Sequence, residues 1–206
     1  MLRGRCRDCG AGISWRYPAI ELAMAALWVL CWLEFGATLQ SIGMAVFCFL
    51  ALGLGAMDAE TLILPDAFTV PGIALGVIFS AAVCGGGWPA RLRCAVAAVG
   101  WAACAAAIVI AIRGTYWLVR RREGMGLGDA KLLAMIAAWL GPANAALTFF
   151  LAVVGGAAYG ILWLAAKRGR SGTSARLPLG SFLCAAAIYA AFGGRATVSW
   201  YLSLFR

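Results

Sequence analysis

The sequence predicts an all-α protein, a polytopic transmembrane helical bundle with about seven spans. Hydrophobic residues make up 64% of the 206 residues and charged residues only 12%, whereas about a quarter of the residues in an average soluble domain are charged. The mean hydropathy is +0.91. The apolar residues also gather in runs of about 20, the length that a helix needs to cross a bilayer. An ordinary soluble domain is therefore excluded.

The apolar runs give the spans in order along the chain. Five are expected near 18–36, 40–57, 67–84, 94–112 and 143–166, with two shorter candidates at 131–141 and 178–202. The segment from Leu132 to Ala166 is too long for one crossing. Gly141 and Pro142 should break it and let the chain reverse, because proline interrupts helical hydrogen bonding. Seven crossings follow.

Lysine and arginine in short loops predict the orientation, because positive residues are retained on the cytoplasmic side. One side would hold Arg3, Arg5, Arg7, Arg16, Arg120, Arg121, Arg122, Lys131, Lys167, Arg168, Arg170 and Arg176. The other side would hold Arg91, Arg93, Arg195 and Arg206. We therefore expect a multi-pass membrane protein with a cytoplasmic N-terminus and no removable signal peptide.

The formal net charge of +9 follows from this topology. The basic residues form short clusters between apolar runs and no continuous stripe, so membrane lipid is the expected partner and nucleic acid is not. Arg113 lies near the cytoplasmic end of the fourth expected span, where a long side chain can reach the headgroups.

Cysteine usage separates one pair from the other six. The six lie in or beside apolar segments and are expected to act as small hydrophobes: Cys31, Cys48, Cys84, Cys94, Cys104 and Cys184. Cys6 and Cys9 form a Cys-x-x-Cys pair, which is half of a four-ligand zinc site in a chain without histidine. Zinc would need a dimer or further ligands upstream, and the alternative is a reduced pair without metal.

Asp58 is the first acidic residue that needs a function. It follows an apolar span directly, in a segment that runs from Met57 to Asp66. An ionisable group so close to hydrocarbon is unfavourable, and it marks a candidate functional site by default. Asp66 follows Pro65 and precedes the next span, so it is a candidate helix N-cap.

Asp129 is the second, and it opens a helix behind three glycines. Gly124, Gly126 and Gly128 supply backbone freedom and remove side-chain bulk, so an extended peptide could lie beside Asp129 through main-chain hydrogen bonds. The start of a helix favours an ionised carboxylate, which makes Asp129 the preferred base, although the two acids could exchange roles. Asp129 could also serve only as an N-cap.

Two carboxylates at close range cannot both ionise cheaply. This is the logic of aspartic proteases, in which the ionised member activates water and the protonated member supports the developing oxyanion. A rival interpretation is a proton-coupled small membrane transporter that uses the paired carboxylates as a relay. Relay acids are expected near the bilayer midplane, whereas Asp58 and Asp129 flank the ends of spans.

The residues Gly126-Leu127-Gly128-Asp129 match the Gly-x-Gly-Asp motif of a known group of membrane aspartyl proteases. The chain resembles the prepilin peptidases, or type IV leader peptidases, of that group. The segments 58–66 and 124–133 resemble the two aspartate loops of this family. Cys6-Arg7-Asp8-Cys9 with Arg16-Tyr17-Pro18 resembles the end of its cytoplasmic domain, and Leu177-Pro178-Leu179-Gly180 resembles its late Pro-x-Gly stretch.

The resemblance implies that Asp58 and Asp129 are the catalytic residues, with Pro65, Gly124, Gly126 and Gly128 in the active-site loops. It implies an intramembrane-type aspartic endopeptidase of the bacterial inner membrane. The enzyme would remove the leader peptide from type IV prepilins or type II secretion pseudopilins at the cytoplasmic membrane face. An inactive scaffold for pilus assembly is the remaining alternative.

Longer members of the family carry an additional first span and two Cys-x-x-Cys pairs. By this comparison, residues 1–17 are a cytoplasmic N-terminal remnant and residues 18–206 are the transmembrane protease domain. Proteolysis should need no cofactor; S-adenosylmethionine would be needed only if a methyltransferase region lay upstream, and an oligomer is compatible with the sequence.

Overall fold

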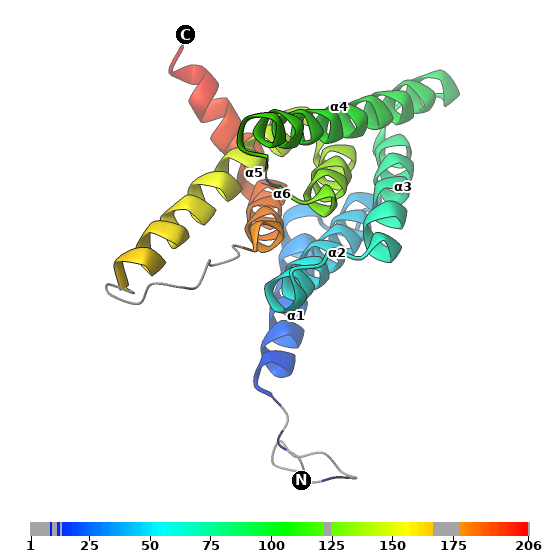
Figure 1. The fold of residues 1–206 in the computed structure, drawn as a ribbon. Helices are drawn as coiled ribbons and strands as arrows, with labels where there is room; N and C mark the ends of the chain where they lie inside the picture. The colour runs from blue at the N-terminus through cyan, green and yellow to red at the C-terminus, as the bar shows by residue number, and fades with distance from the viewer. Residues whose placement is uncertain (1–8, 10–11, 13, 122–124, 167–177, 206) are drawn as a thin grey trace. The chain divides into compact units, whose positions relative to one another are not determined.

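The computed structural model describes residues 9, 12, 14–121, 125–166 and 178–205. Within them the chain forms six helices (Figure 1): α1 (Arg16–Phe35), α2 (Leu39–Thr61), α3 (Asp66–Val83), α4 (Trp88–Arg120), α5 (Leu127–Ala166) and α6 (Leu179–Ser203). Each of the six is long and apolar enough to cross a membrane. The expected all-α transmembrane fold is confirmed.

The chain divides into two compact units, Met1–Phe49 and Leu50–Arg206. In the first unit, the Trp28 indole N–H donates a hydrogen bond to the Ala45 carbonyl over 3.2 Å, which ties α1 to the first part of α2. Gly36 ends α1 in the left-handed region at φ 62°, where glycine is favoured. The predicted domain boundary after residue 17 stays a prediction.

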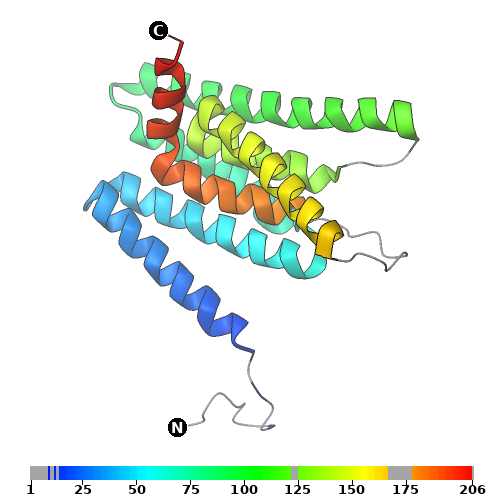
Figure 2. The ribbon, with the colours of Figure 1, turned by 90° about the vertical axis from the view of Figure 1, so that its left-hand side faces the viewer.

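Helix α5 is interrupted where the sequence predicts a break. Gly141 is non-helical, with φ 78° and ψ 175°, and Pro142 follows it. The segment after Gly141 runs back against the direction of the segment before it (Figure 2). The two segments of α5 together with the five other helices agree with the expectation of about seven spans.

Glycines in α3 allow the first segment of α5 to pack closely against it. A Cβ atom at Gly76 would lie 2.6 Å from Trp139 Cδ1, so only a glycine leaves room for this indole. The indole N–H donates a hydrogen bond of 2.8 Å to the Gly72 carbonyl, and the ring stacks on Phe79 at 5.0 Å. These contacts hold the segment that carries Asp129 against α3.

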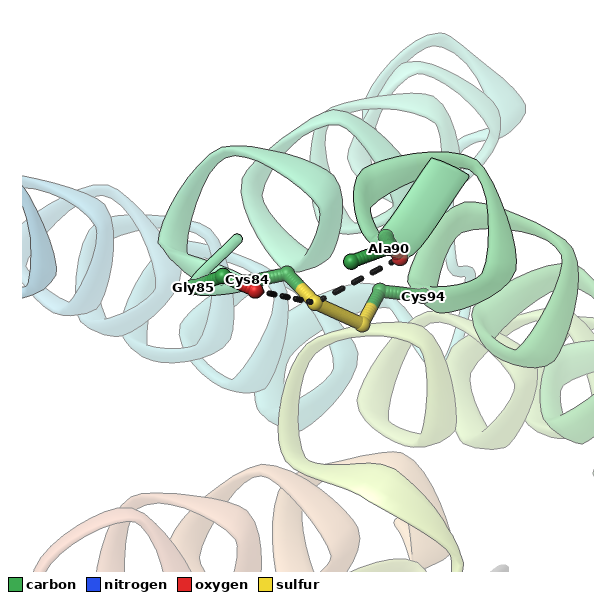
Figure 3. The surroundings of a disulfide bond; sticks show 4 residues. All are labelled: Cys84, Gly85, Ala90 and Cys94. Carbon is green, nitrogen blue, oxygen red and sulfur yellow. Dashed lines mark hydrogen bonds between the residues drawn. A yellow bond between two sulfur atoms is a disulfide. The ribbon is translucent and has the colours of Figure 1, made fainter. Parts of the chain in front are cut away.

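Cys84 and Cys94 form a disulfide between the end of α3 and the first turns of α4 (Figure 3). The expectation that both act as small hydrophobes is therefore wrong. Gly86 has φ 107° in the short connection between α3 and α4, and the reversal brings the two Cα atoms to 6.5 Å. This separation lies in the range that a disulfide can bridge.

Candidate active site

Asp58 lies in the last turn of α2, which continues to Thr61. The expectation of a loop beginning at residue 58 is therefore wrong by about one turn. The Thr61 hydroxyl donates to the Met57 carbonyl over 2.8 Å within this turn, and Leu62 ends the helix with φ 56°. The helical continuation directs Asp58 into the protein, where its side chain is only 5% exposed.

The Asp58 carboxylate lies against the N-terminal turn of α6. Ser181 donates to Asp58 Oδ2 from its backbone N–H over 2.6 Å, and its Oγ lies 3.0 Å from the same oxygen. A Cβ atom at Gly180 would lie 2.7 Å from Asp58 Cγ, so this position must lack a side chain. Hydrogen bonds from a helix N-terminus favour the charged form of a carboxylate.

Asp129 is the third residue of α5. Its Oδ2 accepts a hydrogen bond of 3.2 Å from the backbone N–H of Gly126, the residue just before the helix. An acidic side chain at this position reaches back to the N-cap backbone as in a capping box. Asp129 is thus not the N-cap itself, and its side chain is half-buried.

The Asp58 and Asp129 carboxyl groups are close enough to interact electrostatically. Both also interact with the buried thiol of Cys184, which lies one turn into α6. The ends of α2, α5 and α6 therefore bring two carboxyl groups, seventy-one positions apart in the chain, to one site. Paired acids of this kind can divide base and acid roles between them.

Gly128 allows the connection between α2 and α3 to approach the start of α5. A Cβ atom at this position would lie 3.1 Å from Leu64 Cβ, whereas one at Gly126 would meet Asp129 Oδ2 at 3.4 Å, an ordinary contact. Pro65 is the N-cap of α3 in the extended conformation, with φ −70° and ψ 132°. Of the predicted loop residues, Gly126 and Gly128 thus lie beside Asp129 at the start of α5, and Pro65 lies at the start of α3.

Asp66 is not the N-cap of α3, because Pro65 occupies that position and Asp66 is the first helical residue. Its carboxylate instead accepts two hydrogen bonds from Lys131 Nζ, at 2.6 and 2.7 Å. This ion pair joins the residue that opens α3 to the first turns of α5. It links the two segments that carry the aspartates.

The predicted metal pair, Cys6 and Cys9, is only partly described. Cys9 is an exposed free thiol, whereas Cys6 lies outside the described residues. Gly124, the third predicted loop glycine, also lies outside them. Over the part of the chain that the structure covers, no group of three or more histidine, cysteine or acidic residues could hold a metal ion.

Ser181 is the site residue that sequence reasoning missed. The Pro-x-Gly pattern pointed to the stretch that ends at Gly180, but a serine beside an apolar run carries no signal of its own. What places Ser181 is the contact of α6 with Gly55 of α2: a Cβ atom at Gly55 would lie 2.9 Å from Cys184 Cβ. A contact between two helices that are far apart in the sequence has no local motif, so the sequence does not predict it.

An open cavity of about 400 Å³ lies near the start of α5. It is lined by Ile110, Arg113, Gly114, Trp117 and Leu127. The Arg113 guanidinium donates to the Met125 carbonyl over 3.3 Å. Arg113 and Trp117 therefore give this cavity a cationic and aromatic lining beside Leu127, at the start of α5.

Comparison with known proteins gives two family models that match the chain. The model of the type IV leader peptidase family matches residues 44–161, and that of the bacterial peptidase A24 N-terminal domain matches residues 1–35. No solved structure matches the chain.

Three relatives carry the name prepilin leader peptidase/N-methyltransferase. The protein of Stutzerimonas stutzeri is 35% identical over 100% of this chain and 68% of its own length. That of Pseudomonas putida is 34% identical over 94% and 64%, and that of Burkholderia pseudomallei strain K96243 is 36% identical over 96% and 59%. The chain thus spans about three-fifths to two-thirds of these relatives.

The matched family and these relatives are named as peptidases and give no support to a transporter. The family match covers both aspartates, Gly128 and Pro65, and the relatives match the chain over nearly its whole length. The chain belongs to the type IV leader peptidase family.

Proposed function

We propose that the protein is an aspartic endopeptidase that removes the leader peptide from type IV prepilins or type II secretion pseudopilins at the cytoplasmic membrane face. Asp58 and Asp129 are its catalytic residues. The observation that carries the proposal is the burial of Asp58 against the first turn of α6, within electrostatic range of Asp129 at the start of α5. The printed names of the relatives supply the class of substrate.

Hydrolysis by this pair needs one water molecule and one shared proton. The ionised carboxylate takes a proton from water as the water oxygen attacks the scissile carbonyl carbon, and the protonated carboxyl stabilises the carbonyl oxygen as charge develops on it. The tetrahedral intermediate then breaks its C–N bond. The leaving nitrogen receives a proton from the pair, and the other product is a carboxylic acid.

The glycine-rich segment supports the binding of an extended substrate. Gly126 carries no side chain that would keep a peptide from the backbone beside Asp129, and Gly124 belongs to the same proposed loop. Pro65 fixes the entrance to α3 on the opposite loop. The proposed place for an extended leader peptide is therefore along the backbone beside Gly126 and Asp129.

The disulfide supports the proposed orientation. Disulfides persist in oxidising compartments such as the bacterial periplasm and are rare in the cytosol. Cys84 and Cys94 therefore favour a periplasmic connection between α3 and α4. Asp66 lies at the opposite end of α3, where it pairs with Lys131 close to Asp129. The carboxyl pair of Asp58 and Asp129 therefore belongs at the cytoplasmic face of the inner membrane.

The proposal is limited to the peptidase half of the relatives' printed name. Two carboxyl groups and water suffice for hydrolysis, so neither zinc nor S-adenosylmethionine takes part in the proposed reaction. Membrane lipid is the proposed surrounding of the six helices.

Reconstitution with a prepilin in lipid vesicles tests the proposal. The wild-type chain should shorten the prepilin by its leader, while Asp58→Asn and Asp129→Asn should abolish cleavage and leave the protein inserted. Asp66→Asn is the matched control, because Asp66 pairs with Lys131 and has no place in the proposed chemistry. Cleavage at the wild-type rate by either of the first two variants would remove that aspartate from the mechanism.

A further inference from the structure

The two aspartates have different surroundings, although each lies at a helix end. Asp58 is 5% exposed and accepts a backbone hydrogen bond of 2.6 Å, with a hydroxyl 3.0 Å from the same oxygen. Asp129 is half-buried and accepts one backbone hydrogen bond of 3.2 Å. The two carboxylates are therefore not equivalent in their donors.

Ser181 is the source of both donors to Asp58. Its hydroxyl carries one hydrogen, which can reach either Asp58 Oδ2 at 3.0 Å or the Gly55 carbonyl at 2.9 Å. Its backbone N–H can only donate, so Asp58 Oδ2 remains an acceptor in either case. Donors that converge on one carboxylate oxygen favour its ionised state and fix the rotamer of the side chain.

Both contacts use Oδ2 and none involves Oδ1. Among the described residues, Asp58 Oδ1 accepts no hydrogen bond. The titratable groups that face Asp58 are Asp129 from α5 and the Cys184 thiol from α6.

We propose that Ser181 is a positioning residue that holds Asp58 as the ionised base of the pair, while Asp129 carries the shared proton. This inference rests on the proposed peptidase function. It reverses the assignment that the helix start alone suggests for Asp129. The reason is that Asp58 accepts its hydrogen bonds from another helix, α6, whereas Asp129 accepts one from the N-cap residue of its own helix.

Gly180 also helps to position Asp58. Because a Cβ atom there would lie 2.7 Å from Asp58 Cγ and 2.9 Å from its Oδ2, the backbone of α6 can approach the carboxylate only at a glycine. The close approach is what makes the short hydrogen bond from the Ser181 N–H possible. The two consecutive residues thus form a seat for one carboxylate.

The pH dependence of prepilin cleavage by Ser181→Ala tests the proposal. The acid limb of kcat/KM reports ionisation of the base. Loss of the hydroxyl should move this limb to higher pH by roughly half to one unit, because a hydrogen bond to a charged group is removed. The value of kcat should fall at low pH while KM stays within about twofold of wild type.

Two further variants complete the experiment. Ser181→Thr keeps the hydroxyl and should restore the wild-type limb. Ser199→Ala removes a hydroxyl from the same helix that bonds only the Ala196 carbonyl, and it should leave the profile unchanged. The role of Ser181 would be overturned if the Ser181→Ala protein still cleaves prepilin and its acid limb stays at the wild-type pH. In that case kcat/KM would be lowered by the same factor at every pH. Failure of the wild-type chain to cleave would instead refute the proposed function.

Discussion

At the scale of single residues, the account depends on what surrounds each carboxylate. Asp58 is buried against Gly180 and Ser181, and Asp129 is joined to its own N-cap at Gly126. The sequence singled out both aspartates, because an ionisable residue beside an apolar span is energetically unfavourable. It did not indicate Ser181 in α6, because a serine beside an apolar run is as common in helix packing as in a functional site.

Gly180→Ala should lower prepilin cleavage by about 100-fold, because a misplacement of the base of the order of 1 Å is enough for such a loss. The added methyl group would overlap Asp58 Cγ at 2.7 Å and push the carboxylate from Ser181. Gly53→Ala is the matched control, since nothing lies within 4 Å of a Cβ atom there. Equal cleavage rates for the two variants, measured under the same conditions, would contradict the seat.

The Lys131–Asp66 ion pair should contribute little to stability. Its side chains are 40% and 65% exposed, and exposed ion pairs typically contribute about 0–1 kcal/mol. Lys131→Met should therefore lower the free energy of unfolding in detergent by less than about 1 kcal/mol. A double-mutant cycle with Asp66→Asn measures the coupling, and a value well above this range would show that the pair is a structural clamp.

At the scale of helices, the sequence predicted which helices exist and their order better than the residues at which they begin and end. The break at Gly141 was predictable because glycine before proline disfavours a continuous helix. Helix α4 runs from Trp88 to Arg120, well beyond the expected span 94–112, because hydropathy reports the lipid-facing part of a helix and not its caps. The one-turn extension of α2 that buries Asp58 was missed for the same reason.

Gly141→Ala should lower the free energy of unfolding by about 1–3 kcal/mol, because its φ of 78° with ψ of 175° is strained for any residue with a Cβ atom. Nothing lies within 4 Å of the added atom, so the effect would come from the backbone alone. Gly100→Ala in the middle of α4 has equally open space and a helical backbone, and it should be neutral or stabilising. Unfolding in detergent distinguishes them; similar values would contradict the strained reversal.

Gly128→Ala should impair cleavage more than Gly126→Ala. The first places a methyl group 3.1 Å from Leu64 Cβ and forces the two aspartate loops apart, whereas the second makes an ordinary contact at 3.4 Å. Cleavage rates of the two variants at equal expression give the comparison. The reverse order would show that the approach of Leu64 to α5 is not what aligns the pair.

At the scale of the whole molecule, the topology connects the disulfide with the carboxyl pair. Composition and apolar runs predicted the membrane fold, and lysine and arginine predicted an orientation that stays a prediction. The disulfide could not be predicted, because cysteines ten positions apart meet only when the connection between α3 and α4 reverses. Convergence of α2, α5 and α6 depended equally on tertiary packing.

Thiol labelling in intact cells tests the orientation. Cys9 is exposed and should react only with a membrane-permeant maleimide, whereas Cys84 and Cys94 should react with an impermeant one only after reduction. Cys84→Ser with Cys94→Ser should remove the signal that depends on reduction. Labelling of Cys9 by the impermeant reagent in intact cells would place the N-terminus outside.

The central claim is that Asp58 and Asp129 act as one unit, and the affinity of a transition-state analogue tests it most directly. The analogue is a leader peptide with a hydroxyl-bearing carbon in place of the scissile amide, and its Kd is measured for wild type, Asp58→Asn, Asp129→Asn and the double variant. Each single substitution should weaken binding at least about tenfold, and the double variant should bind no more weakly than the worse single one. Losses that multiply in the double variant would show two independent acids and contradict the account.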